Sequence, residues 1–320
     1  MEDRALANED SEFRILSIDG GGIKGVFPAA FLAELEKSLP EPIYRYFDLI
    51  AGTSTGGIIA LGLGLGLSAS AITSFYEKQG PSIFPAALLS VPMRLARQFL
   101  SSKYSPDALR TALEGEFKAC TLADSRVRLL IPSFNVNNGE IHIYKTRHHQ
   151  RFRTDFRVSM VDVALATTAA PTYFPTHKGV GQALYIDGGL WANNPVGNAV
   201  VEAISWLGIS PQRIRVLSLG CTEFPASLTG LRGGKDWMRK ALEVALRGQS
   251  GGSLGIAYSL VSHERVIRIN PSVPANKFKL DKATTIPELA AHGYLEARKA
   301  SSDLIPRFFY EPAQPFVPLP

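Results

Sequence analysis

The chain has 320 residues, of which 45% are hydrophobic and 20% are charged. This composition is that of a folded globular protein, and it excludes a disordered chain. The formal net charge of +5 favours anionic surfaces, such as phospholipid headgroups or nucleic acid, but identifies neither of them. Two cysteines, Cys120 and Cys221, are too few for a disulfide framework and indicate a reducing compartment.

Hydrophobic periodicity predicts strands and helices that alternate along the chain. Such alternation predicts an α/β fold of three layers, α/β/α, with a mostly parallel central sheet. In chain order, the expected elements are 13–18 (strand), 26–39 (helix), 46–51 (strand), a helix after GTSTG, a helix opened by Ser105, Pro106 and Asp107, two strands within 127–144 around a turn at 137–139, 160–169 (helix), 183–186 (strand), 194–207 (helix), 214–219 (strand), 235–247 and 252–262 (helices), 265–269 (strand) and 286–300 (helix).

Three stretches need a separate interpretation. Residues 49–76 carry no charge and are long enough to span a bilayer, but their Gly, Ser and Thr content favours a buried strand and helix. Residues 81–103 are the least regular part and mix apolar with basic residues, which is typical of a lid or a membrane-facing surface. The basic stretch 145–157 is interpreted as a solvated rim, or alternatively as a docking patch for a phosphate-bearing partner.

The sequence GTSTG at residues 52–56 matches the pattern G-x-S-x-G. It lies where a predicted strand ends and a predicted helix begins. A sharp turn at this place lifts a serine hydroxyl above the sheet, and glycines on either side permit the turn. Ser54 is therefore a candidate nucleophile, although a tight turn without chemistry would show the same pattern.

A second glycine-rich turn, Asp19 to Gly25 (DGGGIKG), also lies between a predicted strand and helix. Its three successive glycines let backbone N–H groups crowd together, and such a nest holds a negative oxygen. One hypothesis is an oxyanion hole for acyl transfer. The other is a dinucleotide-phosphate loop, because Gly20, Gly22 and Gly25 also fit G-x-G-x-x-G. The second hypothesis needs an acid at the end of the next strand, whereas Asp48 lies at its start.

A third candidate is Asp187, which follows the short strand 183–186 and precedes two glycines. An ordinary turn aspartate would have the same surroundings. The combination favours function, because one α/β chain holds a nucleophile turn, a glycine nest and a carboxylate at a strand end.

These motifs resemble those of the patatin-like phospholipases. DGGGIKG, GTSTG, ATTAAPTYFP at 166–175 and DGGLWANNP at 187–195 occur in that family's order, over roughly residues 13–220. The resemblance implies a patatin-like α/β/α fold and a phospholipase that cleaves carboxylic esters. It also implies a Ser-Asp dyad without histidine, in which Ser54 is the nucleophile and Asp187 accepts the proton.

The resemblance assigns roles to the neighbouring residues as well. It implies that the amides of Gly20, Gly21, Gly22 and Ile23 form the oxyanion hole. Lys24 stands where the family has a basic residue, so we expect it to support this loop or to meet an anionic substrate. Five glycines are expected to support the two turns and the acid: Gly25, Gly52, Gly56, Gly188 and Gly189.

Two alternatives remain open at this point. An α/β-hydrolase-type esterase would use a Ser-His-Asp triad, and His263 and His292 occur late enough in the chain for that order. A non-catalytic lipid-binding module on the same fold is the second alternative. Neither histidine has a glycine-rich turn around it, and a non-catalytic copy has no need for Ser54, Asp187 and the nest together.

The opening FRILSIDGGGIKGVFPAAFLAELE is similar to bacterial patatin-like phospholipases. One subgroup of them consists of anti-phage (CBASS) effectors that a cyclic dinucleotide activates. This resemblance implies a cyclic-dinucleotide activator and membrane phospholipid as partners, with no nucleic acid polymer, and a homo-oligomer is a further candidate state. The cations of 145–157, or those after residue 213, are the candidates for the activator's site.

We expect one domain in three parts: an N-terminal extension (1–12), the patatin-like catalytic core (13–210) and a continuation of the same domain (211–320). The N-terminus has no apolar segment typical of a secretory signal, so we expect a cytoplasmic protein that contacts membranes peripherally. The chain lacks H-x-x-x-H and H-E-x-x-H patterns, and its cysteines are far apart. We therefore expect no metal and no cofactor.

Overall fold

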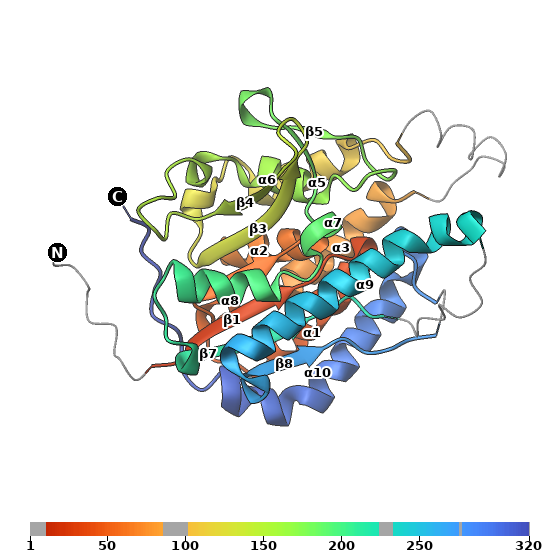
Figure 1. Ribbon diagram of the computed structural model, residues 1–320. Helices are drawn as coiled ribbons and strands as arrows, with labels where there is room; N and C mark the ends of the chain where they lie inside the picture. Colours follow the sequence, from red (N-terminus) through yellow and green to blue (C-terminus); the bar gives the residue numbers. More distant parts are fainter. Residues whose placement is uncertain (1–10, 86–101, 224–232, 275–276, 320) are drawn as a thin grey trace.

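The computed structural model describes residues 11–85, 102–223, 233–274 and 277–319. An eight-stranded sheet forms the middle layer, in the order β5-β6-β3-β2-β1-β7-β8, with β4 pairing beside β3 (Figure 1). The five strands from β3 to β8 along this path are parallel, and β4, β5 and β6 join antiparallel. The strands are β1 (Phe13–Ile18), β2 (Leu49–Gly52), β3 (Arg128–Asn135), β4 (Glu140–Lys145), β5 (His177–Lys178), β6 (Leu184–Asp187), β7 (Ile214–Leu219) and β8 (Val266–Ile269).

Helices cover both faces of this sheet, which confirms the predicted α/β/α layers. Side chains alternate along β1, so Ile15 packs with the helices on one face and Leu16 with those on the other. Helices α8 and α9 cover the first face, and α1, α2, α3, α5, α6 and α10 cover the second (Figure 1). The helices are α1 (Val26–Glu36), α2 (Thr55–Gly64), α3 (Ala69–Ile83), α5 (Asp107–Phe117), α6 (Met160–Thr168), α7 (Gly189–Ala192), α8 (Val196–Ser205), α9 (Gly233–Val261) and α10 (Ile286–Phe308).

The strands after residue 211 belong to the same sheet as the earlier ones. β7 pairs with β1 along its whole length, and β8 pairs with β7. Helix α10 packs against α1 through Gly293, where an added Cβ would lie 2.5 Å from the carbonyl oxygen of Phe27. Close helix packing therefore joins the end of the chain to its beginning.

The prediction of two helices at 235–247 and 252–262 is wrong. A single helix, α9, runs from Gly233 to Val261. The expected break fell at glycines, which lower helix propensity. Tertiary contacts outweigh this cost, because Ser253 in α9 accepts a hydrogen bond from the amide of Gly197 (2.9 Å) and donates one to the carbonyl of Asn194 (2.7 Å).

The ends of several other helices and strands differ from the predicted ends by a few residues. The helix expected at 26–39 ends at Glu36, and the strand expected at 46–51 begins at Leu49, because Ile43–Tyr46 form a 3₁₀ turn. Helix α10 continues past the expected end at residue 300 to Phe308, whose ring is fully buried. Helix α3 was not predicted, and most of the lid expected at 81–103 lies outside the described residues.

The topology brings two distant strand ends together. β4 occupies one edge of β3, so β2 and β6 share the other edge. β2 pairs with β3 as far as Leu130 and then turns away, and β6 arrives from the opposite direction to place Asp187 beside Ser133. The turn after β2 and the end of β6 therefore meet at one place on the sheet.

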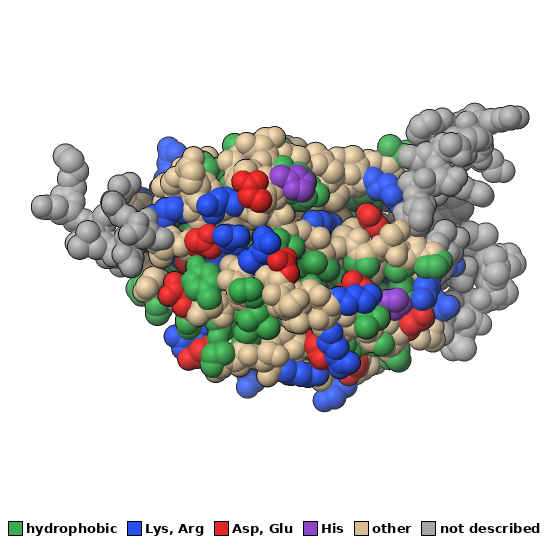
Figure 2. Space-filling view, turned by 90° about the horizontal axis from the view of Figure 1, so that it is seen from below, with side chains coloured by type: hydrophobic (Ala, Val, Ile, Leu, Met, Phe, Trp, Pro, Cys, Tyr) green, Lys and Arg blue, Asp and Glu red, His purple; other side chains and the backbone are tan. Residues whose placement is uncertain are grey.

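The surface view from below mixes acidic and basic side chains, without a large patch of one sign on that face (Figure 2). Among the described residues, no helix is both long and apolar enough to cross a bilayer.

Candidate active site

Ser54 lies on a sharp turn between β2 and α2. Its φ of 54° and ψ of −121° form a left-handed conformation that non-glycine residues seldom adopt. The flanking glycines are required by close contact: a Cβ on Gly52 would lie 2.1 Å from the carbonyl oxygen of Gly56, and one on Gly56 would lie 2.3 Å from that of Ile18. The turn thus places the serine hydroxyl just beyond the end of β2, where Ser54 is 9% exposed.

The Ser54 hydroxyl donates a hydrogen bond of 2.7 Å to Oδ2 of Asp187. The other carboxylate oxygen, Oδ1, accepts the amide of Gly189 at 2.6 Å. Burial raises the pKa of Asp187 to about 6, although these two hydrogen bonds lower it in part. Gly188 permits close approach to β3, since a Cβ there would lie 2.3 Å from the carbonyl oxygen of Pro132.

The glycine loop after β1 adjoins Ser54, because a Cβ on Gly20 would lie 3.3 Å from the Cβ of Ser54. Two of its four candidate amides are already used by the fold: Gly20 donates to the carbonyl of Asn193 (2.9 Å) and Ile23 to that of Leu280 (2.8 Å). In the described part of the chain, the amides of Gly21 and Gly22 have no such backbone partner. They are the donors left for an anionic oxygen.

Lys24 and Gly25 hold this loop against its neighbours. The buried ammonium of Lys24 donates to the carbonyl of Thr222 (3.0 Å), and burial lowers its pKa. This contact fits the first expected role of Lys24, support of the loop. Gly25 lies against α2, where a Cβ would meet Thr55 Oγ1 at 2.0 Å.

Three residues without a predicted role position the site. Thr167, in the ATTAAPTYFP motif, accepts the amide of Ser54 (3.0 Å) and donates to the carbonyl of Pro132 (2.6 Å). Arg268 in β8 forms two hydrogen bonds, 2.8 and 2.5 Å, with the carboxylate of Asp19. Asn193 accepts the amide of Gly20. Thr167 and Asn193 lie within the sequence motifs, which could have indicated them. Arg268 lies in β8, which carries no motif, and only the order of strands in the sheet brings it to Asp19.

The late histidines lie elsewhere. The ring of His263 stacks on Tyr258 at 4.1 Å between centroids, and that of His292 packs edge-on against Phe278. In the described parts of the chain, Asp187 accepts hydrogen bonds only from Ser54 and Gly189. The geometry favours a two-residue arrangement over a triad.

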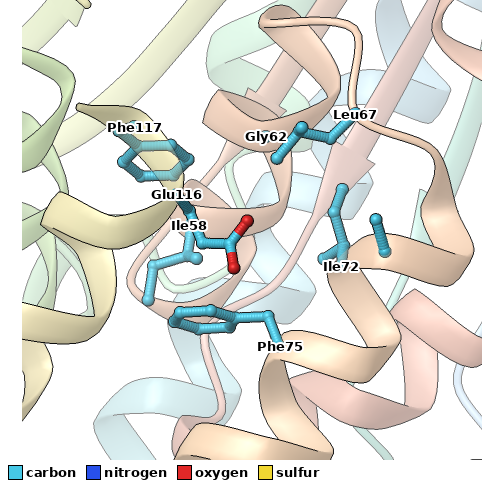
Figure 3. A pocket seen from close by; sticks show the side chains of 8 residues that line it. Ile58, Gly62, Leu67, Ile72, Phe75, Glu116 and Phe117 are labelled. Carbon is cyan, nitrogen blue, oxygen red and sulfur yellow. The ribbon is translucent and has the colours of Figure 1, made fainter. Parts of the chain in front are cut away.

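A small apolar pocket of about 10 Å³ begins one helical turn from Ser54 (Figure 3). Ile58 donates its amide to the carbonyl of Ser54 (3.1 Å) and lines this pocket, whereas Ser54 itself does not. Helices α2, α3 and α5 form its walls, and the charged side chain of Glu116 lies among apolar ones. The lining residues are Ile58, Gly62, Leu67, Ala71, Ile72, Phe75, Glu116 and Phe117.

Comparisons with known proteins identify the class. The patatin-like phospholipase family matches residues 16–200. A cGAMP-activated phospholipase of Pseudomonas aeruginosa (strain BWHPSA011 / Pa011) is 38% identical over 219 residues, which cover 68% of this chain and 65% of that protein. The cGAMP-activated phospholipase of Vibrio cholerae serotype O1 is 31% identical over 345 residues, which cover 96% of this chain and 97% of the relative.

Among solved structures, VipD from Legionella pneumophila has a TM-score of 0.47 and 13% identity, covering 92% of this chain and 67% of that one. The family match and the relatives define this protein as a serine lipid acyl hydrolase. The chain belongs to the patatin-like phospholipase family.

Proposed function

We propose that this protein hydrolyses phospholipid esters with Ser54 as nucleophile, Asp187 as proton acceptor and the amides of Gly21 and Gly22 as the oxyanion hole. The observation that carries this assignment is the 2.7 Å hydrogen bond from Ser54 to a buried Asp187, on a strained turn beside the glycine loop. Strain of this kind persists where the surrounding structure enforces it, which is typical of active sites.

The chemistry follows from this arrangement. Asp187 takes the hydroxyl proton as Ser54 Oγ bonds to the ester carbonyl carbon, and the carbonyl oxygen becomes an oxyanion that accepts hydrogen bonds from the loop amides. The intermediate collapses, the C–O bond to the lysolipid breaks, and the leaving oxygen takes the proton from Asp187. Water then gives a proton to Asp187 and attacks the acyl-serine. The second intermediate collapses, the bond between the acyl carbon and Ser54 Oγ breaks, and Oγ takes the proton from Asp187 as the fatty acid leaves.

The raised pKa of Asp187 suits this role. A carboxylate with an ordinary pKa near 4 is a weak base, whereas one with a pKa of about 6 is stronger and is still mostly ionised at neutral pH. The apolar pocket beside Ile58 has a volume of only about 10 Å³, so the support for a lipid substrate comes from the family match and not from this pocket.

We also propose that cGAMP activates the enzyme, since two of its relatives bear that name at 38% and 31% identity. The Vibrio relative aligns over nearly the whole of both chains, so the match is not confined to the catalytic motifs. Activation would make lipid hydrolysis conditional on the nucleotide.

The test is fatty-acid release from mixed phospholipid vesicles by wild type, Ser54→Ala and Asp187→Asn, with and without cGAMP and with a chelator present. We expect release by wild type in the presence of cGAMP and none by either variant. Equal fatty-acid release by Ser54→Ala and wild type would show that Ser54 is not the nucleophile. Equal fatty-acid release by wild type with and without cGAMP would contradict activation by cGAMP but would still support the proposed hydrolysis.

A further inference from the structure

A second cavity lies at the end of the sheet opposite to Ser54. It has a volume of about 360 Å³, within the usual range of small-ligand sites. Asp48, which directly precedes β2, lines it, and so does Val127, which directly precedes β3, whereas Ser54 follows the other end of β2. Three segments form its walls: residues 44–48, residues 123–127 and the C-terminal tail at 313–318.

The cavity holds cations that are not committed to internal carboxylates. Arg126 hydrogen-bonds the hydroxyl of Tyr44 (3.3 Å), and within the described residues no carboxylate lies in ion-pair range of its guanidinium. Arg45 pairs with Glu41 at 3.3 Å, but both side chains are about 40% exposed, so this pair is weak and exchangeable. Two arginines with accessible donors suit phosphate oxygens, which they can bind through paired N–H groups.

Aromatic rings and one carboxylate complete the lining. Tyr44, which is 9% exposed, and Phe316 both line the cavity, and the more exposed Phe316 is the ring on which a purine base could stack. The Phe316 ring is half-buried, with the Arg128 guanidinium 5.1 Å from its centroid, so the tail is held in place over the cavity. Asp48 accepts the amide of Arg14 through Oδ2 (2.8 Å), and a guanine edge presents N–H donors that a carboxylate accepts.

We propose that this cavity binds the cyclic dinucleotide, with Arg45 and Arg126 on its phosphates and Phe316 against a base. The inference rests on the proposed activation by cGAMP and assigns it a place. Neither the stretch 145–157 nor any Lys or Arg after residue 213 lines the cavity, so the site differs from both sequence-based candidates.

The cavity also has a physical route to the active site. Asp48 joins the first residues of β1 and β2, since it accepts the amide of Arg14 and donates its own amide to the carbonyl of Arg14 (2.8 Å). β1 leads to the glycine loop, and β2 spans four residues, about 13 Å, to the turn that carries Ser54. A ligand against Asp48 therefore contacts the start of the two strands that lead to the glycine loop and to Ser54.

The experiment compares cGAMP binding by calorimetry for the full-length wild type, Arg126→Ala and Phe316→Ala. The matched control is Arg298→Ala, which removes an exposed arginine on α10 that does not line the cavity. Labelling of Ser54 by a fluorophosphonate, measured without nucleotide, checks that each variant keeps a formed active site. Arg126→Lys is the conservative variant, because it keeps the charge and loses the paired donors.

We expect Arg126→Ala and Phe316→Ala to weaken cGAMP binding about tenfold or more, with unchanged serine labelling. Arg126→Lys should fall between Arg126→Ala and wild type, and Arg298→Ala should match wild type. If both cavity variants bind cGAMP with wild-type affinity, the cavity is not its binding site, although cGAMP could still activate the enzyme from another site. No binding of cGAMP to the wild type would overturn the activator and the site together.

Discussion

Ser54 and Asp187 each have a feature that lowers the stability of the folded protein. Ser54 has a positive φ, which costs on the order of 1–3 kcal/mol for a non-glycine residue. Asp187 is buried, and its ionised form loses hydration that two hydrogen bonds only partly replace. Both features lower stability and are typical of active sites, so they agree with the proposed catalytic roles.

Asp187→Asn should abolish hydrolysis and stabilise the fold at neutral pH. Burial raises the pKa of Asp187 from 3.8 to about 6, so ionisation destabilises the folded state by up to about 3 kcal/mol. The wild type carries its full stability below the unfolded pKa of about 4 and loses this part as the pH rises through about 6. Asparagine has no charge to lose hydration, and its amide can still meet Ser54 and Gly189.

Urea denaturation at about pH 4 and about pH 8 measures this difference. The stability advantage of the variant should be small at the lower pH and largest at the higher one. Ser54→Ala serves as the control, because it is also inactive but keeps the buried carboxylate. A variant less stable than wild type at the higher pH would contradict the proposed burial cost.

The pH dependence of hydrolysis should report the same carboxylate. Asp187 accepts a proton only when ionised, so kcat/KM should rise with pH below about 6 and level off above it. A short-chain soluble ester avoids changes in membrane charge during the titration. A rate that is constant through this range would assign the base to a group with a different pKa.

Gly22 is the loop position where a side chain should be least tolerated. Its φ is +57°, and a Cβ there would lie 2.3 Å from the carbonyl oxygen of Leu280. Gly22→Val should lower kcat by about 100-fold or more, because the loop must move and misplace an oxyanion donor. Gly139→Val is the matched control: its φ is +69°, but nothing lies within 4 Å of the added Cβ, so activity should persist. Full activity of Gly22→Val would remove this loop from the oxyanion hole.

At the scale of elements, the sequence predicts the strands better than the helices. The strands at 13–18 and 214–219 have the expected bounds, because each is a short apolar run between clear turns. Glycines mislead the helix prediction: in α9 they are tolerated on an exposed face, and the expected break does not occur. Tertiary packing, which local propensity does not contain, decides such cases.

Some residues of the candidate site could likewise be predicted from the sequence, whereas others could not. Motifs beside strand ends indicate Ser54 and the glycine loop, because the parallel strands β1 and β2 bring their carboxyl ends to one edge of the sheet. The motif of Asp187 also lies at a strand end, but β6 runs antiparallel to β3, so the sheet topology is needed to place Asp187 beside Ser54. The pairing of Arg268 with Asp19 depends on β8 lying two strands from β1, and no local pattern encodes that order. The use of the Gly20 and Ile23 amides by Asn193 and Leu280 is likewise a matter of tertiary structure.

Helix α9 offers a direct test of this argument. Gly251 is exposed in mid-helix, with nothing within 4 Å of an added Cβ, so Gly251→Ala should stabilise the protein by about 0.5–1 kcal/mol. Gly197→Ala, in α8, is the opposite case, because its Cβ would lie 2.9 Å from the carbonyl oxygen of Ser253 and should destabilise the helix pair. Urea denaturation measures the free energy of unfolding, which should increase in Gly251→Ala and decrease in Gly197→Ala relative to wild type. Stabilisation by Gly197→Ala would contradict the close packing of α8 on α9.

At the scale of the whole molecule, the sheet separates two kinds of site. Ser54 and the glycine loop follow the carboxyl ends of β2 and β1, and the arginine-lined cavity lies at the amino ends of these strands. The C-terminal tail reaches this second end, where Ala313 donates to the carbonyl of Arg45 (2.6 Å) and Leu319 to that of Arg147 (2.9 Å) (Figure 1). Ligand binding and hydrolysis can therefore be tested apart.

Ser54→Ala should bind cGAMP as well as the wild type does, because the proposed ligand contacts lie at the other end of the sheet. A ligand that binds only the folded state stabilises it by about 2.7 kcal/mol at a concentration 100 times its Kd. Saturating cGAMP should thus raise the melting temperature of wild type and Ser54→Ala equally, and that of Arg126→Ala much less at the same concentration. Differential scanning fluorimetry over a range of nucleotide concentrations measures all three. A thermal shift that disappears in Ser54→Ala would place the nucleotide at the catalytic end, because only a ligand in contact with Ser54 depends on its hydroxyl.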